Sequence, residues 1–366
     1  MSNVSEQPAH FPLLALPDPC LLAVLQCCAA EDQRSLLNAA RAHSRLHKAA
    51  TLALSSVNIT VQQQRQANNV LVYLDRHGSH VNSLKLSQLQ NDRRAGPLHH
   101  MPSTLQLHIL ELSRWPLQLA PGNGFEGVLG AAVPAPPLKQ LQLDHSYLLD
   151  GTEGLESALL RLPALEHLCL RRNMVHEGWL CFPTGVQQLQ QLTYLELNGV
   201  TVQSPDPASA SPALQLLTAL TRLADLRVIE CRGAKLCVTA SMLAGMCHLT
   251  RLVVNAVGFQ PAALAGKAKL QHLELVGWGF AQAMLRFEQA GGAAGVAQML
   301  SQLQQQTQLT HLNLEDMSGR EVGSGDLPAA AYTDLTASYS TSTSAGANFL
   351  PVYGSICSLS AGSCCT

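Results

Sequence analysis

Apolar residues recur along this chain with a constant spacing: a leucine, two other residues, a leucine, one residue and a leucine, with valine or isoleucine as substitutes. The first of these units starts at residue 54 and the last at residue 309. The nine steps between them cover 255 residues, about 28 residues a step, which is typical of a repeat structure. The spacing starts at Leu54, Val81, Leu107, Leu138, Leu165, Leu192, Leu223, Leu249, Leu270 and Leu309.

The spacing within each unit predicts a short strand. The last two apolar positions are two residues apart, so their side chains point to the same face of an extended chain. Positions three, five and seven of the unit point to the opposite face. We therefore expect one strand in each unit, and we expect the strands to stack into a parallel sheet whose apolar face is covered by the rest of each unit.

The residues between the predicted strands carry apolar residues three and four apart, which favours helices. Leu155, Leu159 and Leu162 precede one strand, and Met242 and Met246 precede another. A purely helical repeat is the alternative. Strand-favouring runs such as RLVVNAV argue against it.

Three steps are longer than the others and predict insertions. Residues 116–137 and 203–212 are rich in Gly and Pro and are expected to form loops. Two short helices are expected on either side of the GGAAG segment at 291–295. Residues 1–10 are predicted to be a flexible N-terminus, and residues 320–366 a low-complexity, partly disordered tail.

Over residues 54–319 the chain resembles the leucine-rich-repeat family. The segment LEHLCLRRN, which ends at Asn173, has the family's full motif, and Cys231 takes the same ninth position as in cysteine-type repeats. The resemblance implies an α/β solenoid, a horseshoe with its parallel sheet on the concave face, spanning residues 51–319. The chain departs from the family's asparagine ladder at the ninth position of the other units, which hold Leu89, Trp115, Ser146, Val200, Val257, Trp278 and Met317.

Residues 11–50 differ from the repeats and predict two helices. Asp18 is expected to be the N-cap of the first, with Pro19 at its first position, and the second is expected from about Asp32. The segment resembles an F-box, through the opening LPD at 16–18, the apolar pairs that follow, and the basic residues Arg41 and Arg45. The family's tryptophan near the end of the motif is absent.

The F-box resemblance implies docking on a Skp-type adaptor of a cullin–RING ubiquitin ligase. The alternative is a helical cap that shields the first repeat from water, and the two are compatible. The residues expected to bind the adaptor are Leu16, Pro17, Leu21, Leu22, Val24, Leu25, Leu36, Leu37 and Leu46.

The composition argues against several classes of function. The net charge of −2 at pH 7 gives no general attraction to nucleic acid or anionic lipid. No run of about 18 apolar residues and no signal peptide is recognised. The eleven cysteines match no zinc signature, so we expect buried free thiols in a reducing compartment, cytoplasmic or nuclear. A cytoskeletal or axonemal location is the alternative.

No catalytic motif for phosphate binding, serine hydrolysis or metalloproteolysis is found, so the sequence predicts neither an enzyme nor a cofactor. His167, His272 and His311 share one position of the repeat, which raises the question of a metal site. Strand spacing near 4.8 Å keeps His167 well away from His272, so we expect ordinary surface histidines.

The concave face is the expected binding surface, and its mixture of both charge signs with a tyrosine suits a protein partner. The functions left open are a ligase substrate receptor, a repeat scaffold without a ligase link, and an enzyme regulator. The residues expected to contact the partner are His167, Arg171, Tyr194, Glu196, Asp225, Arg227, Arg251, His272 and Glu274.

Overall fold

The computed structural model describes residues 13–31, 33–89, 101–102, 105–119, 138–175, 178–202, 216–231, 237–255, 258–276, 301–303 and 305–315. The predicted flexible N-terminus (1–10), the predicted tail (320–366) and the segments at 203–212 and 291–295 lie outside these residues, as does 120–137 of the first predicted loop.

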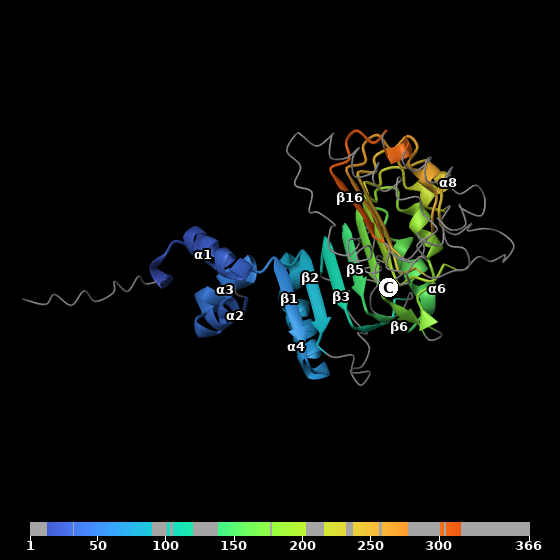
Figure 1. Cartoon of the computed structure of the whole chain (residues 1–366). Helices are drawn as coiled ribbons and strands as arrows, with labels where there is room; N and C mark the ends of the chain where they lie inside the picture. The colour runs from blue at the N-terminus through green and yellow to red at the C-terminus, as the bar shows by residue number, and fades with distance from the viewer. Residues whose placement is uncertain are drawn as a thin grey trace, which may run out of the picture.

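A ten-stranded parallel sheet is the frame of the molecule (Figure 1). Its strands are β1 (Ser56–Val61), β2 (Ser83–Gln88), β3 (Ile109–Ser113), β5 (Gln140–Asp144), β7 (His167–Arg171), β10 (Tyr194–Asn198), β11 (Asp225–Ile229), β13 (Arg251–Asn255), β15 (His272–Val276) and β16 (His311–Glu315). Each strand begins two residues after the start of a leucine unit, and the spatial order follows the chain order. The predicted leucine-rich-repeat solenoid is confirmed.

The strands pair without any shift of register. Tyr194 lies beside His167 on one side and beside Asp225 on the other, and all three are at position three of their units. Positions three, five and seven therefore form three continuous rows along the concave face, which we define as the face of the ten-stranded sheet that carries these rows.

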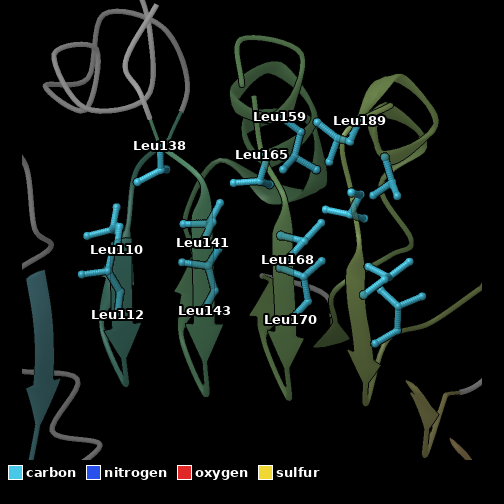
Figure 2. Packing of buried hydrophobic residues seen from close by; sticks show 14 of the residues in the cluster. Leu110, Leu112, Leu138, Leu141, Leu143, Leu159, Leu165, Leu168, Leu170 and Leu189 are labelled. Atoms are coloured by element: carbon cyan, nitrogen blue, oxygen red, sulfur yellow. The ribbon is translucent and has the colours of Figure 1, made fainter. Parts of the chain in front are cut away.

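Leucines at positions one, four and six fill the interior behind this sheet in repeated layers (Figure 2). Leu141 and Leu143 of β5 are each 1% exposed, and their counterparts Leu168 and Leu170 of β7 are fully buried. Because each layer packs only on the next, burial of apolar surface is spread along the whole solenoid.

A tight turn at position eight ends several strands. Arg114, His145, Arg172 and Glu230 adopt positive φ angles of 47° to 63°, and Gly199 at the same position has 68°. A left-handed residue reverses the chain direction after a strand, and the turn is followed in several units by a two-residue strand. The two-residue strands of the described chain are β4 (Pro116–Leu117), β6 (Tyr147–Leu148), β8 (Met174–Val175), β9 (Gly178–Trp179), β12 (Cys237–Val238) and β14 (Gly258–Phe259).

A hydrogen bond from the side chain at position nine recurs along this chain, whether or not that residue is asparagine. A side-chain donor at position nine reaches the backbone carbonyl at position six of the preceding unit, where a buried carbonyl needs a partner. These bonds run from Trp115 Nε1 to Leu86 (3.2 Å), from Ser146 Oγ to Leu112 (3.4 Å), from Asn173 Nδ2 to Leu143 (3.0 Å) and from Cys231 Sγ to Leu197 (3.4 Å).

The prediction of helices in the returning half of each unit, the residues between one strand of the sheet and the next, is only partly right. Val186 and Leu189 are buried by a 3-10 turn, because apolar residues three apart fit that turn as well as an α-helix and need fewer residues. The α-helices are α4 (Gln64–His77), α6 (Gly151–Leu159) and the single turn α8 (Ala240–Leu243). The 3-10 turns are η2 (Gly78–His80), η3 (Thr184–Gln188), η4 (Leu216–Ala219) and η5 (Pro261–Leu264).

The N-terminal segment contains η1 (Leu13–Ala15), α1 (Asp18–Glu31), α2 (Gln33–Ala42) and α3 (Ser44–Ala53), and these helices lie beyond the β1 end of the sheet (Figure 1). The predicted second helix is divided at His43, whose backbone is extended (φ −158°, ψ 142°) and whose ring accepts a hydrogen bond from the Arg45 amide. The Leu21 amide donates to the Pro17 carbonyl, so Pro17, rather than the predicted Asp18, is the N-cap.

Candidate functional site

A buried carboxylate lies at the middle of the concave face. Glu196 of β10 is 3% exposed and accepts two hydrogen bonds from Arg171 of β7, at 2.5 Å and 2.8 Å. The Tyr194 hydroxyl donates to the same carboxylate at 2.6 Å. Register places position seven of β7 diagonally beside position five of β10, so the pair joins two neighbouring repeats.

The ionisation of this group follows from its partners. Burial alone raises the pKa of Glu196, but the hydrogen bonds from Arg171 and Tyr194 outweigh it, and the pKa is lowered overall. Burial and the Glu196 charge raise the pKa of Cys169, the neighbour in the same row. Cys169 is therefore a protonated thiol and a poor nucleophile.

Aromatic and cationic side chains surround the carboxylate on the same face. The Tyr194 ring is stacked on His167, with the centroids 3.8 Å apart and the planes at 3°. The Arg227 guanidinium lies 5.0 Å from the centre of the Tyr194 ring, within range of a cation–π interaction. Arg227 also makes two hydrogen bonds to Asp225, at 3.1 Å and 3.0 Å.

Two polar atoms on this face lack a hydrogen-bond partner among the described residues. They are Asn198 Oδ1 and Arg251 Nε. Arg251 Nε is 4.0 Å from the nearest Asp225 carboxylate oxygen, too far for a hydrogen bond. A buried polar atom without a partner costs free energy, and a bound molecule can supply the missing bond.

The last two described strands bring two histidines together. His272 of β15 and His311 of β16 have stacked rings with centroids 4.0 Å apart, and His272 Nε2 is 3.4 Å from a Glu274 carboxylate oxygen. Burial, Arg251 and His311 lower the pKa of His272 more than Glu274 raises it. The sequence indicated ordinary surface histidines, with His167 well away from His272. His167 is indeed remote from this pair, but His272 and His311 touch.

All nine residues that the sequence indicated for partner binding lie on the concave face, between β7 and β15. The predicted set does not include the Lys85–Glu111 ion pair of β2 and β3, whose charged atoms are 2.7 Å apart. Both residues occupy position five of their units, so the repeat pattern already contained the signal.

The predicted adaptor-binding residues separate into two groups. Leu21, Leu25, Leu36 and Leu46 are buried and hold the N-terminal helices together; Pro17 and Val24 are exposed, while Leu16 and Leu22 are half-buried. The side chain of Leu37 lies outside the described part of the chain.

Arg45 of α3 fastens the start of this segment. Its guanidinium bonds to Asp18 at 2.6 Å and to the Leu16 carbonyl at 2.7 Å, and it also contacts the Leu14 carbonyl. Arg45 is one of the basic residues that carry the F-box resemblance. In the structure it holds residues 14–18, which precede and begin α1, against α3.

Gln33 of α2 connects the N-terminal helices to the sheet. Its amide nitrogen donates to the Ser56 carbonyl at 2.9 Å, and its oxygen accepts from the Asn58 amide at 3.0 Å. These are backbone groups on the outer side of β1, the first strand of the sheet, so one side chain satisfies part of an otherwise open edge.

The seven cysteines whose side chains the structure describes are free: Cys20, Cys27, Cys28, Cys169, Cys181, Cys231 and Cys247. Cys169 and Cys231 are buried, as the sequence indicated, and burial raises the pKa of the Cys231 thiol to about 12. Cys20, Cys27 and Cys247 are exposed, so the prediction of burial is wrong for these three. They lie on helix or turn surfaces, where the apolar pattern does not reach the core.

No family model and no curated protein sequence matches the chain. Among solved structures, an internalin from Listeria monocytogenes is similar at 16% identity and a TM-score of 0.37, over 61% of this chain and 62% of its own. Internalin C2 from the same organism has 16% identity and a TM-score of 0.38, over 72% and 96%. A Leptospira interrogans leucine-rich-repeat protein has 14% identity and a TM-score of 0.32, over 74% and 80%.

This chain thus spans less than two thirds of the first internalin. Similarity at these levels assigns no function to the chain. Among the helices that the structure describes, none has both the length and the apolar character needed to cross a membrane.

Proposed function

We propose that this chain binds a protein partner with its concave face, and that α1–α3 attach it to a Skp-type adaptor of a cullin–RING ubiquitin ligase. In that role it is a substrate receptor. The free thiols are in keeping with a reducing compartment, the cytoplasm or the nucleus.

The observation that carries the adaptor half of the proposal is an apolar stripe on α1 that nothing in the described chain covers. Cys20, Ala23, Val24 and Cys27 are all exposed, and their spacing of three, four and seven residues places them on one helix face. Leu21 and Leu25 on the neighbouring face are buried, so the apolar surface of α1 is wider than the part that the described chain covers. A helix of that kind is stable in water when a second surface packs on it.

The concave face supports the partner half of the proposal. Ten strands about 4.8 Å apart give a surface roughly 43 Å long, which is enough to contribute to an interface of standard size. Arg227, Asp225 and Glu196 supply both charge signs around Tyr194, and the unpartnered atoms of Asn198 and Arg251 face the same side. Arg and Tyr are enriched where proteins bind each other.

A second candidate function rests on Gln33. Because its side chain satisfies the edge of β1, α1–α3 can act simply as the N-terminal cap of the solenoid. The protein is then a scaffold or regulator without a ligase link, for example on a cytoskeletal or axonemal assembly.

The test is a binding assay between the purified full chain and a purified Skp-type adaptor. We expect the wild-type chain to bind and Val24→Asp to lose binding, because Val24 is 40% exposed on the α1 stripe. The matched control is Val72→Asp, a valine 52% exposed on α4 of the first repeat, which should bind like the wild type. Absence of adaptor binding by the folded wild-type chain would remove the ligase proposal and leave the scaffold.

A further inference from the structure

The end of the concave face at β15 and β16 gathers three metal-ligand side chains. His272 and His311 are register partners at position three of the last two described strands, and their ring planes differ by only 5°. Glu274 lies two residues after His272 on the same face. One nitrogen from each ring and one oxygen of Glu274 lie within 4.8 Å of one another.

We propose that His272, Glu274 and His311 bind a divalent transition metal of the zinc type. Two imidazoles and one carboxylate are a donor set that such ions accept, and three protein ligands leave a coordination position for water or for a side chain of a bound protein. This inference is independent of the adaptor proposal, because it involves the opposite end of the sheet.

The distances favour a site that closes on an ion with small movements. Two ligand atoms on one tetrahedral zinc ion are about 3.4 Å apart, given metal–ligand bonds near 2.1 Å. His272 Nε2 and the Glu274 oxygen are already 3.4 Å apart. His311 is exposed, so its ring can rotate to shorten the remaining separations.

The electrostatic surroundings contain one favourable and one opposing feature. The Glu274 carboxylate oxygen, 3.4 Å from His272 Nε2, supplies a negative charge that attracts a cation. Arg251 lies beside His272 in the sheet register, and its positive charge repels a cation. Asp225, 4.0 Å from Arg251, offsets part of that charge.

His167 offers a matched comparison on the same face. It also occupies position three, but its ring is stacked on Tyr194 and not on another histidine. It lies on β7, four strands from β15, which is roughly 19 Å at the usual strand spacing. His167 therefore does not reach the proposed site.

The experiment is titration of the full chain with Co²⁺, an optical substitute for Zn²⁺, followed by competition with Zn²⁺. We expect saturable binding of a single cobalt ion, without the strong sulfur-to-cobalt absorption that a cysteine site gives. His272→Asn and His311→Asn should each weaken binding by about tenfold or more, and His167→Asn should leave it unchanged. Arg251→Gln should tighten binding, because it removes the repelling charge.

Circular dichroism and urea unfolding establish that each variant is folded. A wild-type chain that binds no cobalt, a sulfur-type spectrum, or equal affinity in His272→Asn, His311→Asn and wild type would each overturn the proposal. Weaker cobalt binding by Arg251→Gln would also count against the proposal, because removal of a positive charge beside the site should favour a bound cation.

Discussion

At the residue scale, the strongest constraint on the concave face is the charge of Glu196. The carboxylate is nearly out of contact with water, and its charge is retained because Arg171 and Tyr194 donate to it. Removing one member of a buried ion pair costs more than the pair itself contributes, since the other charge loses its partner. Arg171 is 37% exposed, so water partly compensates.

We expect Glu196→Gln to lower the free energy of unfolding by about 1–3 kcal/mol, because a neutral amide is a weaker acceptor for Arg171 and also introduces a donor towards Tyr194. Urea unfolding measures this change. The control is Glu166→Gln, whose ion pair with Lys139 is exposed on both sides and should contribute nothing measurable. Equal effects of the two substitutions would contradict the importance of burial.

At the element scale, the N-terminal helices have two separable roles. Leu21, Leu25 and Leu36 form their interior, and Gln33 attaches them to the backbone of β1. An exposed strand edge invites pairing with another chain, so the Gln33 contact protects the solenoid at its first strand. The exposed stripe of α1 takes no part in either role and is the surface on which the adaptor proposal rests.

Gln33→Ala should speed hydrogen exchange of the Asn58 amide by about fivefold, which corresponds to loss of a hydrogen bond of about 1 kcal/mol. Gln33→Glu keeps an acceptor for that amide, so exchange at Asn58 should stay slow. Gln190→Ala, an exposed glutamine next to η3, is the control for a glutamine substitution elsewhere. If Gln33→Ala left the Asn58 exchange rate unchanged, the contact would not protect the edge.

At the scale of the whole molecule, stability should depend on pH through the concave face. Burial is the main cause that lowers the pKa of His167 and of His272 below the ordinary value of 6.5. Below pH 6.5 the unfolded chain therefore binds more protons than the folded chain. The stabilisation is complete above 6.5 and is lost as the pH falls through the lowered values. The lowered pKa of Glu196 adds a further loss below 4.5.

We therefore expect the midpoint of thermal unfolding to be lower at about pH 5.5 than at about pH 7.5, with a weaker dependence in the double variant His167→Gln, His272→Gln. Circular dichroism at the two pH values measures it. Equal or higher stability in acid would contradict the sign of these pKa changes.

The repeat spacing was sufficient to predict the strands and their faces. A period of two residues in an extended chain decides by itself on which face of the sheet each side chain lies, so the layers of Leu141, Leu143, Leu168 and Leu170 and the rows of the concave face follow from local rules. The type of helix in the segments between the strands could not be predicted from the spacing. A spacing of three fits an α-helix and a 3-10 turn alike, and the room left by neighbouring units selects between them.

By itself, the sequence determined the ten strands, their order and the residues that face outward, because these depend on contacts within one repeat and on the constant step between repeats. The tertiary structure alone decided which outward residues meet. Arg171 reaches Glu196, His311 stacks on His272 and Gln33 reaches β1 across gaps of 25, 39 and 23 residues. Such contacts depend on side-chain conformation and helix packing as well as on strand register, and these are decided only when distant segments of the chain come together.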